Sequence, residues 1–354
     1  MGKINFEFPQ IEDSGCLLPD LARAQAYRYA NDHLTLKKLI KAIGIAEKSF
    51  ALDFALLIQS LDQATEGLKQ SGKLSSFIHS LCNTILMQIR DQQTGPALES
   101  ISQLSAQPLI VQDTRIGLLH PENWNLAEQQ CITQILNEED KEVWHAASAS
   151  DTEPPWAAQL IHLTRDAMTT IVEANTELAR EIDCYIGEIG MLDAPTFISG
   201  SAKTLPGFLL LNRLRHGQNS STIIELLIHE TTHQYIFMVE ERDQLFLNDR
   251  ELSFYSELRD SERPLIGIFH AMVVMARIIW CIGNLAEKGC FSTSHGPFVA
   301  AFKTPKELSY LDVFDSLLAT VQQHAELTPM GLRIVDSAEQ LVAAAACKSL
   351  WKES

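Results

Sequence analysis

The residues best suited to chemistry lie in the segment ELLIHETTHQYIF, residues 225–237, which contains an HExxH motif. His229 and His233 are four residues apart, so on a helix both imidazoles project from one face and can share a metal ion. Glu230 places a carboxylate beside them. Such a carboxylate can be a general base, bind the metal, orient a ligand or contact substrate. The motif therefore predicts a metal site and leaves the role of Glu230 open.

The residues around the motif predict that its helix is buried. Thr222 and Glu225 have the T-x-x-E spacing of a capping box, in which each side chain satisfies a free backbone N–H at the start of the helix. The flanking positions are apolar: Ile223, Ile224, Leu227, Ile228, Ile236 and Phe237. Two imidazoles and a carboxylate in apolar surroundings need compensating partners, which favours a functional site over an accidental match.

A third metal ligand would separate the classes of HExxH enzyme. A metzincin would have glycine at 236 and histidine at 239, whereas this chain has Ile236 and Val239, so that class is excluded. A zinc peptidase of gluzincin type would use a later glutamate, and Glu251 or Glu257 is available. The other candidate is His270, in a second apolar segment.

That second segment, residues 267–283, is predicted to be a buried helix with His270 and Arg277 on one face. An arginine in the middle of a membrane costs about 2.5 kcal/mol or more, which argues against a membrane span. A buried Arg277 keeps its charge and needs an anion, either a structural Asp or Glu or an acidic small molecule near the metal. Arg259 and Arg263 add two more guanidiniums, which is unusual for a peptidase.

The combination of LIHETTH with FYSELRDSERPLIGIFHAMVVMAR resembles the HExxH-type 2-oxoglutarate-dependent peptide β-hydroxylases, which are encoded with ribosomally synthesised, post-translationally modified peptides. In that family an Arg-x-x-x-Arg-Pro-x-x-Gly-x-x-His-like segment follows HExxH. The corresponding residues here are Arg259, Arg263, Pro264, Gly267 and His270. The resemblance covers about residues 223–280, and the N-terminal half matches only in being helical.

The resemblance implies iron(II) rather than zinc, bound by His229, His233 and His270. Glu230 or Glu257 is the alternative third ligand. Open positions on the ion would accept 2-oxoglutarate and dioxygen.

The resemblance also implies the reaction and the partner. The expected enzyme is a 2-oxoglutarate-dependent dioxygenase that hydroxylates a side-chain β-carbon of a ribosomal precursor peptide during natural-product maturation. Arg277, Arg263 or Arg259 would bind the far carboxylate of 2-oxoglutarate through a bidentate fork. The alternative is a zinc metallopeptidase of gluzincin type with Glu230 as general base.

Periodicity predicts a fold that is mainly α with a small β-sheet, in which the HExxH helix packs against the helix carrying His270 and Arg277. Apolar residues at three-and-four spacing predict helices at 21–45, 50–68, 74–90, 156–182, 313–326 and 332–350. Short apolar segments bounded by glycine and proline predict strands within 108–121 and 184–211.

A polar, proline-containing segment at 147–155 is the best linker candidate. It separates a helical N-terminal region, 1–150, which could hold the leader of the peptide, from a metal-binding catalytic region, 151–354. The two regions could also form one domain.

Composition indicates a soluble protein, since 46% of the 354 residues are apolar and 21% are charged. A net charge of −17 argues against general nucleic-acid binding and against docking on an anionic membrane. The seven cysteines are scattered without a CxxC pair, which is typical of reduced thiols in a cytoplasm. We therefore expect a cytoplasmic protein with neither nucleic acid nor membrane as a partner.

Overall fold

The structure is a computed structural model that describes residues 16–50, 53–68, 72–119, 123–133, 135–136, 140–141, 154–195, 198–214, 219–249, 251–290 and 308–346. These residues form many helices and three small sheets, so the predicted mainly α fold with a small sheet is confirmed. The predicted linker at 147–155 lies outside the described residues except for Pro154 and Pro155.

The chain divides into two compact units, each assembled from segments that are separate in the sequence. Unit 1 comprises Met1–Ala26, His162–Ile182 and Leu214–Ser354, and unit 2 comprises Tyr27–Ile161 and Asp183–Arg213. The boundary expected near residue 150 stays a prediction.

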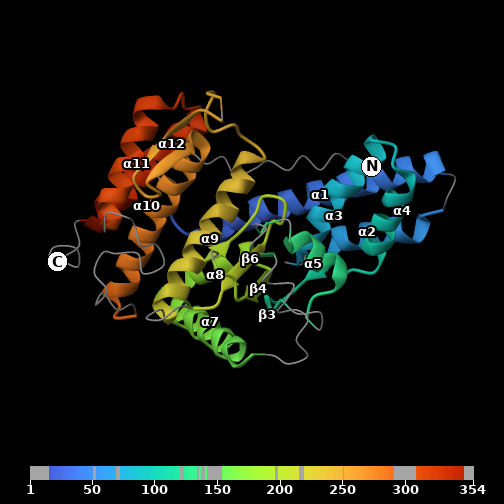
Figure 1. The fold of residues 1–354 in the computed structure, drawn as a ribbon, viewed down its shortest axis with the longest axis horizontal. Helices are drawn as coiled ribbons and strands as arrows, with labels where there is room; N and C mark the ends of the chain where they lie inside the picture. Colours follow the sequence, from blue (N-terminus) through green and yellow to red (C-terminus); the bar gives the residue numbers. More distant parts are fainter. Residues whose placement is uncertain are drawn as a thin grey trace. The chain divides into compact units, whose positions relative to one another are not determined.

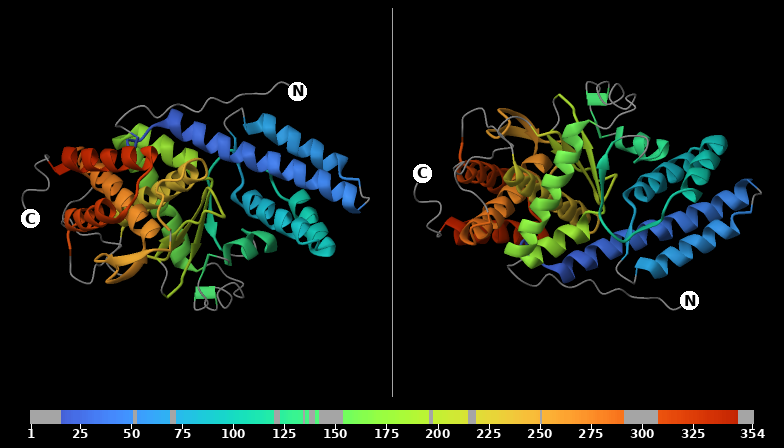
Figure 2. Two further views of the ribbon diagram at one scale, coloured as in Figure 1. Left: turned by 90° about the horizontal axis from the view of Figure 1, so that it is seen from above. Right: turned by 90° about the horizontal axis from the view of Figure 1, so that it is seen from below.

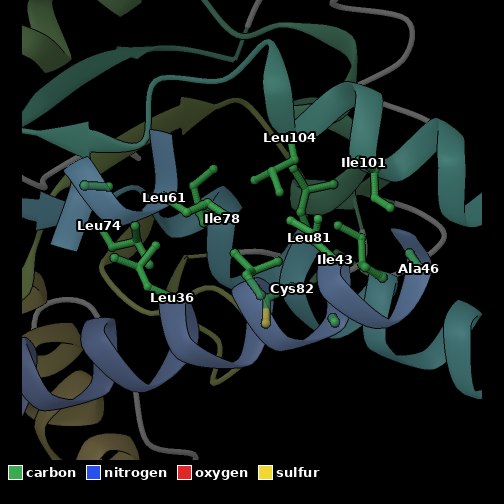
Figure 3. Close-up of a cluster of buried hydrophobic side chains, with 14 of the residues drawn as sticks. Leu36, Ile43, Ala46, Leu61, Leu74, Ile78, Leu81, Cys82, Ile101 and Leu104 are labelled. Atoms are coloured by element: carbon green, nitrogen blue, oxygen red, sulfur yellow. The ribbon is translucent and has the colours of Figure 1, made fainter. Parts of the chain in front are cut away.

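Unit 2 begins with a helical layer. It consists of α1 (Leu21–Phe50, from Tyr27 onward), α2 (Ala55–Leu68), α3 (Ser76–Arg90) and α4 (Thr94–Ser105). Both views of Figure 2 show α1 and α2 side by side. Each helix contributes an apolar stripe to one buried cluster, shown in Figure 3, which includes Leu36, Ile43, Leu61, Ile78, Leu81 and Leu104.

The main sheet of unit 2 has the order β3-β4-β6-β5. β3 (Arg115–Leu118), β4 (Glu188–Leu192) and β6 (Phe208–Asn212) are parallel, whereas β5 (Ser199–Gly200) runs antiparallel to β6. Every residue of β4 and β6 is buried, which explains their nearly continuous apolar sequence.

Smaller elements complete unit 2. β1 (Lys73–Leu74) pairs antiparallel with β2 (Ile110–Val111), and α5 (Leu126–Thr133) follows β3. A second apolar cluster contains residues from α3, α5, β4 and β6 and the loops beside them, including Phe77, Trp124, Ile132, Leu192 and Phe208.

A buried polar network ties α1 to α3 and β1 within unit 2. The carboxylate of Asp32 accepts hydrogen bonds from the Arg28 guanidinium at 2.9 Å and from the Leu74 backbone N–H at 2.9 Å, and it lies 2.9 Å from Nε2 of His79. Burial alone would raise the pKa of Asp32, but the charges and hydrogen bonds of Arg28 and His79 lower it overall. This network is fully internal and stabilises the fold.

In unit 1, a central helix, α10 (Leu265–Glu287), contacts three others. They are α9 (Ser220–Glu240), α11 (Tyr310–His324) and α12 (Pro329–Ala346), and the group can be followed at the yellow-to-red end of the chain in Figure 1. A hairpin of β7 (Ser253–Ser256) and β8 (Ser261–Pro264) joins α9 to α10.

One long helix was predicted over 156–182, and this prediction is wrong in one respect. The structure has two helices there, α7 (Pro155–Ala174) and α8 (Thr176–Tyr185). Asn175 separates them, because its side-chain oxygen accepts a hydrogen bond from the Leu178 N–H at 3.1 Å, as a helix N-cap does.

Within the described residues, α10 is the one helix long and apolar enough to cross a membrane. Of its most apolar 18-residue window, 78% is buried inside the protein. This burial is what a core helix of a soluble protein shows, and it explains how the helix tolerates Arg277 in its interior.

Candidate functional site

The metal-binding motif lies on α9, whose start differs from the predicted capping box. Asn219 is the N-cap, and its side chain accepts a hydrogen bond from the Ser221 N–H at 2.9 Å. The Thr222 hydroxyl accepts from the Asn219 N–H at 3.4 Å. The predicted pairing of Thr222 with Glu225 is therefore wrong, because Asn219 takes the capping position three residues earlier.

The two histidines of the motif lie on the accessible stripe of an otherwise buried helix. From Thr222 to Glu240, every residue of α9 is buried except His229, His233, Phe237 and Glu240, which are partly buried, and the side chain of Glu240 is itself covered. Their spacing of four, four and three residues places them on one face. The two imidazoles therefore lie together on the least buried face of α9.

The geometry of the pair fits a shared metal ion. Nε2 of His229 lies 3.2 Å from Nε2 of His233, and the ring centroids are 4.9 Å apart. Two nitrogens about 2.1 Å from one ion, at octahedral or tetrahedral angles, are separated by roughly 3.0–3.4 Å. The observed separation of 3.2 Å between the two Nε2 atoms falls within this range. These two side chains therefore fit a metal.

The surroundings keep both imidazoles neutral. Burial, followed by the nearby charge of Arg259, lowers the pKa of His229 from 6.5 to about 3. Burial also lowers the pKa of His233 well below 6.5, with smaller contributions from His229, His270 and Arg259. A neutral imidazole is the form that binds a metal, so the site requires no deprotonation at neutral pH.

His270 is brought to the same place by α10. Its side chain is buried, its ring centroid lies 5.8 Å from that of His233, and its Nε2 atom lies 3.0 Å from Oε1 of Glu240. As the described side chains are placed, no three His, Cys, Asp or Glu residues form a ready metal site. The two residues whose distance fits a shared metal ion are thus His229 and His233, and His270 lies beside them.

The three glutamates considered from the sequence are spread over different surroundings. Glu230 is 2% exposed and lies off the accessible stripe, on a buried part of α9. Glu251 precedes β7 and is exposed, and Glu257 follows β7 and is partly exposed. Glu240, which the sequence analysis missed, is a carboxylate that contacts His270.

Two arginines lie on the hairpin between α9 and α10, and the positive charge of one of them, Arg259, reaches the histidine pair. Arg259 lies in the turn between the strands, close enough to lower the pKa of His229 and His233, and Arg263 lies on β8. Arg259 lies at the surface with its guanidinium partly covered. This partial burial lowers the pKa of Arg259, and the neighbouring charge of Arg263 lowers it further. Two guanidiniums that disfavour each other's charge favour a bound anion.

Arg277 does not face the histidines. Its guanidinium binds the Glu181 carboxylate of α8, with Nη1 at 3.3 Å from Oε1 and a second, shorter contact from Nη2. The side chains are 1% and 0% exposed, and Arg23 lies 3.8 Å from the same carboxylate. The anion that Arg277 requires is therefore a structural glutamate, the first of the two alternatives that the sequence left open.

A second buried carboxyl group lies on α9 one turn before His229. Glu225 is 1% exposed, and one of its oxygens accepts a hydrogen bond from the Tyr310 hydroxyl at 2.9 Å. The other oxygen, Oε1, is buried without a hydrogen-bond partner among the described residues. Burial raises the pKa of Glu225 from 4.5 to about 8.

This raised pKa predicts a pH-dependent stability. Between about pH 5 and 8 the folded protein keeps a proton on Glu225 that the unfolded chain releases, so the Glu225 contribution to the free energy of unfolding falls as pH rises. Glu225→Gln is expected to match the wild type at pH 5 and to be more stable at pH 8, by on the order of 2 kcal/mol. Urea unfolding at both pH values measures the difference. Glu241→Gln, an exposed neighbour of the same helix, is the control, and an equal effect of Glu225→Gln at both pH values contradicts the assignment.

Comparison with known proteins yields no relative: no family model matches the chain, and no curated protein sequence matches it.

Proposed function

We propose that the protein is an iron(II)- and 2-oxoglutarate-dependent oxygenase that hydroxylates a side-chain β-carbon of a ribosomally synthesised peptide. The observation that carries the proposal is the His229–His233 pair, with its Nε2 atoms 3.2 Å apart on the accessible stripe of a buried helix. The resemblance of the segment around Arg259, Arg263 and His270 supports the choice of iron and 2-oxoglutarate over zinc.

The residues of the chain have separate roles in this proposal. His229 and His233 would hold the ion, with His270 as third ligand and Glu230 or Glu257 as alternatives. When bound, iron(II) with 2-oxoglutarate and dioxygen supplies the oxidising power to hydroxylate an unactivated C–H bond. Phe237, whose ring stacks on His233 at 5.8 Å, shields one side of the site from water.

The arginine pair distinguishes this proposal from the zinc peptidase. A peptidase needs a metal, a base such as Glu230 and an electrophile, but no pair of guanidiniums beside the metal. A dicarboxylate co-substrate that chelates the ion through one end presents a second carboxylate to the protein, and Arg259 and Arg263 supply its charge partners. Since Arg277 is bound to Glu181, we assign the co-substrate to Arg259 and Arg263.

Arg259→Gln is expected to weaken 2-oxoglutarate binding to the iron-loaded protein by about 10- to 100-fold, because it removes one or two charge-assisted hydrogen bonds. Anaerobic titration with 2-oxoglutarate measures the affinity. Arg180→Gln, which breaks an exposed ion pair with Glu177, is the control and should leave the affinity unchanged. Unchanged affinity in both Arg259→Gln and Arg263→Gln would contradict the assignment.

The peptide partner and the compartment complete the proposal. We place the substrate among ribosomal precursor peptides in the cytoplasm, and we assign leader binding to the region 1–150. Within that region, α2, α4 and the loops beside them line a pocket of about 600 Å³ whose apolar walls are Phe54, Leu57, Leu104 and Leu109.

A further inference from the structure

The contact between Glu240 and His270 joins the end of the metal-binding helix to the neighbouring helix. Oε1 of Glu240 lies 3.0 Å from Nε2 of His270. The side chains are 3% and 10% exposed, so both groups are almost removed from water. A carboxylate and an imidazole are costly to bury and are stable there only when they are hydrogen-bonded, as these two groups are to each other.

We propose that Glu240 is a positioning residue that sets the proton position and the orientation of His270 for metal binding, an inference that rests on the proposed function. An ionised carboxylate can only accept a hydrogen bond, so the ring nitrogen facing it, Nε2, carries the proton. The other nitrogen, Nδ1, then keeps its lone pair and is the atom able to bind a metal. Histidines that bind metals commonly donate their second N–H to a carboxylate in this way.

Helix geometry shows why Glu240 acts through His270 and does not bind the same ion as His229. Glu240 is seven residues beyond His233 and eleven beyond His229, which places it about 10 Å and 16 Å farther along the helix axis. A glutamate side chain is too short to cover that distance. His270 comes from α10 and contacts both residues of α9. Its ring lies 5.8 Å from the His233 ring, and its Nε2 atom lies 3.0 Å from Oε1 of Glu240.

Phe237 fixes the remaining freedom of the histidine. Its ring lies 5.6 Å from the His270 ring and 5.8 Å from the His233 ring. With Glu240 on one side and Phe237 on the other, His270 is held beside the metal pair at little cost in side-chain entropy on binding. The affinity of the site for a metal therefore depends on the contact that Glu240 makes between α9 and α10.

Cobalt(II) binding tests the inference, because its visible absorption reports both affinity and coordination. Glu240→Ala is expected to weaken cobalt(II) binding by about 10- to 100-fold and to change the absorption bands. Glu240→Gln should recover part of the affinity, since its amide oxygen still accepts from Nε2. Glu241→Gln, with the adjacent exposed carboxylate changed, should bind as the wild type does.

A double-mutant cycle with His270→Ala separates positioning from a general structural role. If Glu240 acts through His270, the double variant binds cobalt(II) no more weakly than His270→Ala alone. Additive losses would overturn the inference, and so would wild-type affinity in a folded Glu240→Ala variant. Failure of the wild type itself to bind cobalt(II) would instead overturn the proposed function together with the inference.

Discussion

His233→Ala is expected to lower metal affinity by at least about 100-fold and to abolish turnover, because it removes one of the two imidazoles that fit a shared ion. The fold should survive, since His233 is one of the few residues of α9 that are not fully buried. Bound iron(II) or cobalt(II) per folded protein is the quantity to measure, with circular dichroism to confirm folding.

A matched histidine variant isolates the effect of position. His162 lies on α7, is exposed, and pairs with Asp166 at 2.8 Å, so His162→Ala should leave metal content unchanged. Wild-type metal content in a folded His233→Ala variant would show that the histidine pair is a structural contact of α9.

Glu181→Leu is expected to lower the free energy of unfolding by about 3–5 kcal/mol. The substitution leaves the guanidinium of Arg277, which is 1% exposed, without the carboxylate that it binds, and it removes a carboxylate 3.8 Å from Arg23. A buried arginine cannot lose its charge, so the cost appears as lost stability. Urea or thermal unfolding measures it directly.

Two comparisons make the stability result specific. Glu177→Leu alters an exposed residue of the same helix and should change the stability by less than about 1 kcal/mol. The double variant Glu181→Leu with Arg277→Met should recover part of the loss, because it removes both buried charges. Wild-type stability of Glu181→Leu would contradict the structural role, and a folded Arg277→Met variant with weakened 2-oxoglutarate binding would return Arg277 to the co-substrate site.

Local patterns were sufficient to predict most of the helices. The three-and-four spacing that predicted a helix over 74–90 corresponds to α3 (Ser76–Arg90), and the stretch predicted over 332–350 corresponds to α12 (Pro329–Ala346). Such spacing is a property of each segment alone, so it can be read without knowing the partners. The break at Asn175 was missed because apolar periodicity continues on both sides of it, although the asparagine was a visible capping signal.

The partners of the charged residues could not be predicted, because they are distant in the sequence. Arg277 meets Glu181 across 96 positions, and Tyr310 meets Glu225 across 85. Nothing local to these residues indicates which acidic or hydroxyl group will face them. Glu240 is different, since its spacing of seven from His233 already placed it on the histidine face of the helix. Helical periodicity alone is therefore enough to place Glu240 on the face that carries the histidines.

The most direct test of the proposed chemistry is anaerobic reconstitution of the metal-free protein with iron(II), followed by titration with 2-oxoglutarate. We predict a visible charge-transfer band from the chelated co-substrate that saturates at one equivalent and is absent in His233→Ala. No band, together with tight stoichiometric zinc binding, would contradict the oxygenase proposal and leave the zinc peptidase, with Glu230 as its general base.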